Sequence, residues 1–155
     1  MSAIREQVLK QVRKGDVFTI TRTFSQQETE EFGDLTRDYN PVHYDRGFAE
    51  ASGYPDLICH GLLIGGMICE IGGQLAWLAT SMEFRYLRPV FFGDTITCRL
   101  EITDLDERGR AMAEAEFFNQ RGEKVLEAGL GGYLPGQEKK QVLAGLEPGD
   151  KSRLA

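Results

Sequence analysis

The strongest constraint on the fold is an apolar stretch, residues 57–79, which reads LICHGLLIGGMICEIGGQLAWLA and carries no charge before Glu70. A segment that is apolar on nearly every side is typical of a buried central helix, and we expect that helix to begin at about His60. Glycine weakens a helix but lets it pack very closely against a sheet. The glycines of this stretch are Gly61, Gly65, Gly66, Gly72 and Gly73. The longest run without a charge, Leu57 to Cys69, is interrupted by His60 and is too short to cross a bilayer, so no membrane partner is expected.

The segment before this stretch predicts a strand followed by a helix. Residues 17–24, VFTITRTF, alternate apolar and polar side chains with the two-residue period of a half-buried strand. Ser25, with Glu28 three residues later, is the signature of a capping box that opens a helix. We expect that helix to end near Arg37 or Asp38. The side chains expected to face inward are Thr29, Phe32 and Leu35.

From Ser81 onward, the pattern is that of antiparallel strands. Breaks at Pro89 and residues 93–94, and turns at residues 106–109 and 121–122, divide it into about four strands. The order is therefore strand, helix, loop, buried helix and a run of strands. This order predicts an α+β domain in which one antiparallel sheet wraps a long central helix.

The length of 155 residues favours a single domain, which we place at residues 14–135. Residues 1–13 are polar and basic and form an N-terminal arm, either a short amphipathic helix or a loose segment. Residues 136–155 form a C-terminal tail, either mobile or folded as a short docking helix.

Charge and cysteine usage exclude several classes of function. Lys and Arg total 18 against 24 Asp and Glu, a net charge of −6, so no nucleic-acid partner is expected. The sequence MSAIREQVLKQVRKGD lacks the apolar region of a secretory signal. Cys59, Cys69 and Cys98 form no CxxC pair and are expected to be reduced thiols, which favours a cytoplasmic location. With only His43 and His60 as histidines, we predict no metal site.

The loop DYNPVHYD, residues 38–45, has the residues for acid–base chemistry. Proline keeps the preceding residue out of a helix, so Asp38 and His43 lie on one stiff loop and can point at the same spot. A carboxylate beside an imidazole is suited to hold a water or a proton at neutral pH. Asn40 supplies an amide that can donate to a substrate oxygen or fix Asp38. A short helical turn is expected over residues 46–51.

A second candidate lies at His60-Gly61, where the buried helix is expected to begin. The first backbone N–H groups of a helix lack intrahelical partners and carry the positive end of its dipole. Gly61, without a Cβ, lets a carbonyl oxygen approach its N–H closely. Such a donor can stabilise a developing oxyanion or enolate.

These residues resemble a known family. RDYNPVHYDRGFA followed by LICHGLL strongly resembles the hydratase 2 motif of the MaoC-like family, the hot-dog-fold (R)-specific enoyl-CoA hydratases and dehydratases. GDVFTITRTFSQQETEEFGDLT and FRYLRPVFFGDTI are similar to other parts of the family, so the resemblance covers roughly residues 14–135. It implies a hot-dog fold and a lyase that adds water across the C2=C3 bond of a 2-enoyl thioester, or removes it in reverse. It implies no cofactor beyond the coenzyme A or acyl carrier protein that carries the substrate.

The resemblance also implies roles for individual residues. Asp38 and His43 match the catalytic pair that holds the water, and Asn40 matches its supporting amide. Gly61 matches the residue whose backbone N–H polarises the thioester carbonyl. At Gly66 the chain departs from many bacterial members, which carry a serine there, and we expect this to affect acyl-chain preference.

Substrate binding and assembly are expected to be linked. Arg85 and Arg88 are candidates for the phosphates of coenzyme A, although solvated charges on a strand are the commoner fate of such residues. His60 is expected to hydrogen-bond the backbone and shape the turn. Because a lone sheet leaves an edge strand open, and the family is generally dimeric, we expect a homodimer or a dimer-based oligomer. Either arginine could then reach the phosphates from the second copy.

Two other functions fit the same fold. Hot-dog thioesterases rely on a carboxylate on the central helix, for which Glu70 is the only candidate here. A non-catalytic acyl-CoA-binding partner subunit would be expected to have lost the pair Asp38 and His43, which is intact. Fold alone does not separate these functions, so the choice depends on the site.

Overall fold

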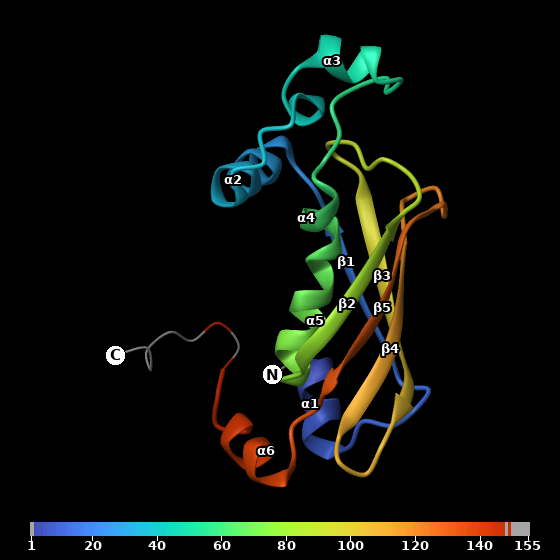
Figure 1. Cartoon of the computed structure of the whole chain (residues 1–155). Coiled ribbons are helices and arrows are strands. Elements are labelled where there is room, and N and C mark those ends of the chain that lie inside the picture. The colour runs from blue at the N-terminus through green and yellow to red at the C-terminus, as the bar shows by residue number, and fades with distance from the viewer. Residues whose placement is uncertain (1, 148, 150–155) are drawn as a thin grey trace.

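The computed structural model describes residues 2–147 and 149, and its centre is one antiparallel sheet curled around a helical axis (Figure 1). The five strands have the spatial order β1-β3-β4-β5-β2, so β1 and β2 are the two edges. The strands are β1 (Val17–Thr23), β2 (Leu78–Tyr86), β3 (Thr95–Leu105), β4 (Arg110–Phe118) and β5 (Lys124–Tyr133). The helices are α1 (Ala3–Lys10), α2 (Gln26–Thr36), the 3₁₀ turn η1 (Pro41–His43), α3 (Arg46–Ala51), α4 (Gly61–Gly65), α5 (Met67–Leu75) and α6 (Gln137–Leu143). The predicted α+β architecture, with a sheet around a central helix, is confirmed.

The central helix is shorter than predicted and is divided in two at Gly66, between α4 and α5. It ends at Leu75 because Ala76 adopts the left-handed conformation, with φ 51°. The N–H of Trp77 donates to the carbonyl of Gly72 at 2.9 Å, which closes the helix end. The last residues of the apolar stretch, expected to be helical, therefore enter strand β2 instead.

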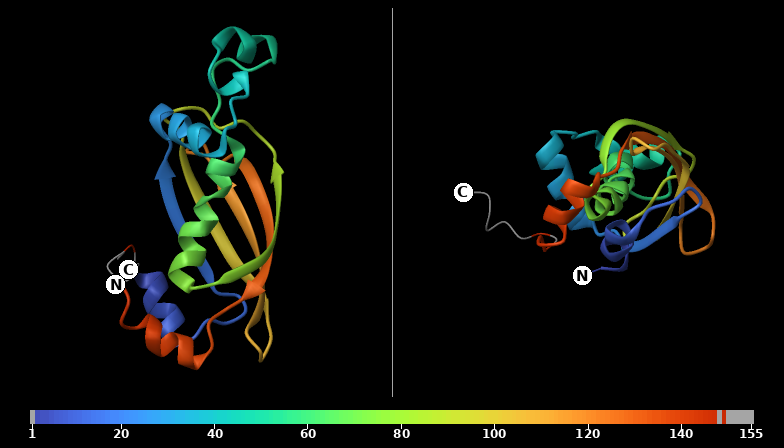
Figure 2. Two further views of the ribbon diagram at one scale, coloured as in Figure 1. Left: turned by 60° about the vertical axis from the view of Figure 1, so that its left-hand side comes forward. Right: turned by 90° about the horizontal axis from the view of Figure 1, so that it is seen from below.

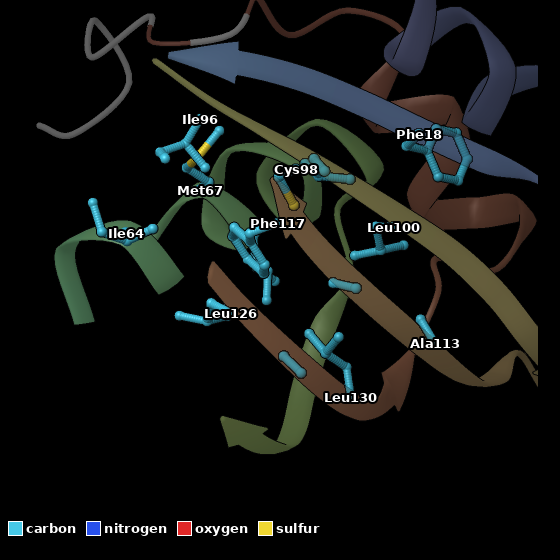
Figure 3. Packing of buried hydrophobic residues seen from close by; sticks show 14 of the residues in the cluster. Phe18, Ile64, Met67, Ile96, Cys98, Leu100, Ala113, Phe117, Leu126 and Leu130 are labelled. Carbon is cyan, nitrogen blue, oxygen red and sulfur yellow. The ribbon is translucent and has the colours of Figure 1, made fainter. Parts of the chain in front are cut away.

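The core lies between this helix and the concave face of the sheet (Figure 3). Every second residue of β3 points inward, as the alternation predicted, and Phe117 and Leu126 meet them from β4 and β5. The inward residues of β3 are Ile96, Cys98, Leu100 and Ile102. Met67 and Ile64 fill the opposing side from the central helix.

Two predictions about burial are wrong, one for the central helix and one for α2. The central helix is not buried on all sides, because Leu62 is 59% exposed and Cys69 is also exposed. In α2, Thr29 is buried and Phe32 is half-buried, but Leu35 is 83% exposed. The capping box that starts α2 is present, with Ser25 and Glu28 each bonded to the other's backbone. Local signals therefore placed the helix correctly but did not fix every side chain that it buries.

Both ends of the described chain pack against the sheet and helix. Residues 3–10 form the helix α1, which places Val8 in the main core and lets the Arg5 guanidinium donate to the carbonyl of Gly73 at 3.3 Å. Helix α6 buries Leu143 against the same core, so this part of the tail is a docked helix. The rest of the predicted tail falls mostly on residues 148 and 150–155, which lie outside the described residues. Along the described chain, no helix combines the length and the hydropathy needed to cross a membrane.

An overhanging segment, made of α2, η1 and α3, stands beyond one end of the sheet (Figures 1 and 2). Val42, Ala49 and Leu57 form a small apolar cluster within it. The chain returns to the sheet through an isolated antiparallel bridge between Ile58 and Phe91 and then starts α4. This return brings the loop after α2 next to the beginning of the central helix.

Candidate functional site

The loop after α2 is shaped by two local features. Arg37 ends α2 in the left-handed conformation, with φ 60°, and so reverses the chain just before Asp38. Asn40 then caps η1, accepting a hydrogen bond from the N–H of Val42 at 3.3 Å, and Pro41 occupies the first position of the turn. The N–H of Asn40 donates to Asp38 Oδ1 at 3.3 Å. The loop thus orients the Asp38 carboxylate with its own backbone.

Asp38, His43 and His60 meet at the start of α4. One polar side-chain atom of each residue lies within 4.8 Å of those of the other two. The rings of His43 and His60 are stacked, with centroids 3.8 Å apart and planes at 29°. His60 Nε2 is 3.8 Å from Asp38 Oδ2. The prediction that Asp38 and His43 point at one spot therefore agrees with the geometry, and His60 joins them.

The hydrogen bonds assign opposite tautomers to the two imidazoles. His43 Nδ1 lies 2.8 Å from the carbonyl oxygen of Ile58, and because a carbonyl only accepts, Nδ1 carries the proton. His43 Nε2 is then left with a lone pair. His60 Nε2 lies 2.9 Å from the carbonyl oxygen of Asp38, so there Nε2 carries the proton. His60 Nδ1 is buried without a hydrogen-bond partner among the described residues.

The protonation of His43 suits a base. Burial lowers the pKa of His43 below its ordinary value, and the neighbouring His60 acts in the same direction. The Ile58 carbonyl and the Asp38 carboxylate oppose this shift without cancelling it. His43 is therefore neutral near pH 7 and presents the Nε2 lone pair to a proton donor.

This arrangement suits proton transfer better than metal coordination. A carboxylate and two imidazoles are common metal ligands, and a bond from the other ring nitrogen to a backbone carbonyl is compatible with that role. In His60, however, Nε2 both lies 3.8 Å from Asp38 Oδ2 and donates to the carbonyl of Asp38, so it would have to lose its proton and its partner to bind an ion beside the carboxylate.

Gly61 is the first residue of α4, and His60 is the residue before it. The N–H of Gly61 belongs to the first turn and has no intrahelical acceptor, as the sequence predicted. The structure adds a second reason for glycine at this position. A Cβ there would lie 2.5 Å from Cε1 of Tyr86, so the tyrosine ring from the edge strand β2 needs the space. Sequence reasoning missed Tyr86, because only the folded chain brings β2 against α4.

A cavity of about 530 Å³ opens beside these groups. Asp38, His43, His60 and Gly61 line one side of it, and Arg88 lies at its edge. The rest of the lining is largely apolar and includes Phe32, Tyr54, Ile58, Ile64, Tyr86, Leu87, Pro89, Val90, Val125 and Leu126. The cavity therefore combines a few polar groups with room for an apolar chain.

Of the other predicted site residues, Arg88 lines this cavity, whereas Asn40 and Arg85 lie outside it. Asn40 contacts the loop backbone and is not part of the lining, which favours the role of fixing Asp38 over direct contact with substrate. Arg85 forms an ion pair with Glu127 at 3.1 Å, in a different hollow of the sheet, while Arg88 donates to the carbonyl of Lys124 at 2.7 Å. Glu70, the carboxylate required by the thioesterase alternative, is exposed on α5 and does not line the cavity.

One family model, two relatives and one solved structure are similar to this chain. The family model described as MaoC like domain matches residues 8–120. An (R)-specific enoyl-CoA hydratase from Aeromonas caviae is 30% identical over 115 residues, which cover 70% of this chain and 84% of the relative. A 3-hydroxyacyl-thioester dehydratase Y from Mycobacterium tuberculosis is 35% identical over 111 residues, 66% of this chain but only 37% of that protein. The solved (R)-hydratase from A. caviae superposes with a TM-score of 0.76 at 26% identity, covering 81% of this chain and 99% of that one.

Proposed function

Since this chain belongs to the MaoC-like dehydratase family and is an enzyme of the hydro-lyase kind, we propose that it is an (R)-specific enoyl-CoA hydratase. It adds water across the C2=C3 bond of a 2-enoyl thioester, and in reverse it dehydrates a 3-hydroxyacyl thioester. Its fold is the hot-dog fold of its structural neighbours. The observation that carries the proposal is the meeting of Asp38, a neutral His43 and the start of α4 at one end of an apolar cavity.

In this proposal, water binds between Asp38 and His43. The Nε2 lone pair of His43 takes a proton from the water as its oxygen forms the bond to C3, and the carboxylate of Asp38 orients the water and stabilises the imidazolium. The electrons of the double bond move to the thioester, where the Gly61 N–H stabilises the enolate oxygen. A proton from the Asp38 and His43 pair then adds to C2. Atoms and charge balance, and both additions occur on one face of the substrate.

The cavity and the edge strand support a model for the substrate and the assembly. The apolar lining suits the acyl chain, and Arg88 at the rim suits a phosphate of the carrier. Strand β2 is an open edge, and its side chains Leu78 and Met82 are exposed. We expect a second copy to pair along this edge and cover these side chains. Arg85 could then serve the site only from the partner chain, and that role stays a prediction.

The test is a substrate assay with two readouts. Crotonyl-CoA and longer 2-enoyl-CoAs are offered to the purified chain, and loss of the conjugated enoyl absorbance is followed together with release of free thiol. Hydration without thiol release is expected. Thiol release without hydration would overturn the proposal in favour of a thioesterase, and neither reaction on coenzyme A or acyl carrier protein thioesters would favour a non-catalytic partner subunit.

A further inference from the structure

Two residues beside Asp38 have no part in the mechanism above, although each fits the other closely. Gly33 is a buried residue in the middle of α2, and Tyr44 follows η1. A Cβ built on Gly33 would lie 1.7 Å from the hydroxyl oxygen of Tyr44 and 3.0 Å from its Cζ. The tyrosine hydroxyl therefore occupies the space that any other side chain at position 33 would fill. We call the space above Gly33 the notch. Glycine inside a helix lowers the stability of the helix, so the contact with Tyr44 must offset that loss of stability.

The hydroxyl in the notch reaches the backbone of Asp38. Tyr44 Oη donates to the carbonyl oxygen of Asp38 at 3.4 Å, and His60 Nε2 donates to the same oxygen at 2.9 Å. Burial, followed by the charges of Asp34 and Asp38, raises the pKa of Tyr44, so the phenol keeps its proton at neutral pH. One carbonyl is thus held by donors from two segments that are far apart in the sequence.

Asp38 needs such support because of its place in the chain. The residue before it, Arg37, has a φ of 60°, a conformation that costs free energy for a residue with a side chain. The Asp38 side chain itself is 51% exposed, so it has few packing contacts to fix its direction. Beside the bond from the Asn40 N–H to Oδ1, the hold on the backbone carbonyl is a second means of keeping the carboxylate beside the imidazoles.

We infer that Tyr44, seated in the notch of Gly33, is a positioning residue that works with His60 to hold Asp38 in its reactive orientation. This inference rests on the proposed function, because it treats the Asp38 carboxylate as catalytic. Tyr44 does not line the cavity, so it acts through Asp38 and not on the substrate.

A double-mutant cycle tests the notch. Gly33→Ala should displace the hydroxyl and lower kcat at least about tenfold, whereas Tyr44→Phe, which loses one hydrogen bond, should lower kcat about 3- to 10-fold. The double variant should resemble Tyr44→Phe alone, because removing the hydroxyl removes the main clash and leaves a 3.0 Å approach to Cζ, which a shift of a few tenths of an ångström relieves. The unfolding midpoint should likewise fall in each single variant and fall no further in the double variant than in Tyr44→Phe. Additive losses in both kcat and midpoint would overturn the fit between the two residues.

A matched control separates positioning from general damage to the loop. Tyr39 lies on the same loop, and its hydroxyl donates to Asp34 at 3.2 Å without touching Asp38. Tyr39→Phe should leave kcat within about twofold of the original, while Tyr44→Phe lowers kcat and leaves KM unchanged. A fall in kcat of equal size in both variants, or none in Tyr44→Phe, would overturn the inference.

A spectroscopic readout keeps this test independent of activity. The chain has two histidines, so the ring nitrogens can be assigned by NMR. The Nε2–H resonance of His60, which shares its acceptor with Tyr44, should move in Tyr44→Phe and stay in Tyr39→Phe. If this resonance moves in Tyr44→Phe but the original chain hydrates no enoyl thioester, the shared hold on the Asp38 carbonyl is supported and the proposed function is refuted. If it stays in place in Tyr44→Phe, the shared hold on Asp38 is refuted whatever the activity.

Discussion

Replacing Asp38 by asparagine removes the charge proposed to be catalytic with the least disturbance of the structure. Asparagine has the same shape and can still accept the N–H of Asn40, which reaches Asp38 Oδ1 at 3.3 Å. The bond from His60 goes to the backbone carbonyl and is unaffected by the side chain. Because the carboxylate is half-exposed, the free energy of unfolding should change by no more than about 0.5 kcal/mol.

The effect on turnover should be much larger. Acid–base groups contribute about 10²–10⁴-fold, so Asp38→Asn should lower kcat at least about 100-fold. The assay is hydration of crotonyl-CoA at saturating substrate, with the unfolding midpoint measured on the same preparation. Near-normal turnover by the folded variant would refute the role of Asp38.

A second variant tests whether the two residues act together. His43→Ala should lower kcat by a similar factor, and it should also reduce stability, because it removes a buried ring with a bond to Ile58. The double variant should be little worse than the worse single variant, since residues that act as one unit are not additive. If the fold-loss of kcat in the double variant equals the product of the two single losses, Asp38 and His43 serve separate steps.

Five further outcomes follow from the structure. Gly61→Val should abolish turnover, and if Tyr86→Ala in the same chain restores it, the ring of Tyr86 and not access to the N–H explains the glycine. Because burial lowers the pKa of His43, kcat/KM should fall with decreasing pH only below the ordinary histidine value of about 6.5. The unfolded chain takes up that proton first, so stability should be full above about pH 6.5 and decrease as the pH falls toward the lower folded pKa, a slope that His43→Gln should reduce. Arg88→Ala should raise KM for coenzyme A thioesters with little change in kcat, and an unchanged KM would exclude this arginine from binding. Light scattering should give at least a dimer, whereas a fully active species of 17.4 kDa would contradict the paired edge strands.

Sequence signals of short range predicted much of the fold. Ser25 and Glu28 fixed the start of α2, and the alternation of residues 96–102 gave the inward face of β3. The end of the central helix was harder to predict, because it depends on a left-handed alanine, Ala76, that no residue preference indicates. The exposure of Leu35 was also missed, since an apolar residue at helical spacing carries no information on what lies opposite it.

The site likewise contains one part that the sequence predicts and one part that only the folded chain reveals. The proximity of Asp38 and His43 could be predicted because both lie on one stiff loop and need no long-range packing to meet. Tyr86 could not, because the close approach of β2 to α4 arises only when the sheet curls. The contact between Gly33 and Tyr44 likewise packs a helix against a turn, and no pattern in a single sequence predicts it.

In the proposed mechanism, Asp38 and His43 add both parts of water from one side of the substrate. Hydration of crotonyl-CoA in D₂O tests this, because the product records the face of each addition. The expected product is (R)-3-hydroxybutyryl-CoA with a single deuterium at C2, added on the same face as the hydroxyl group. An (S) product, or deuterium added to the opposite face or to both, would contradict this mechanism.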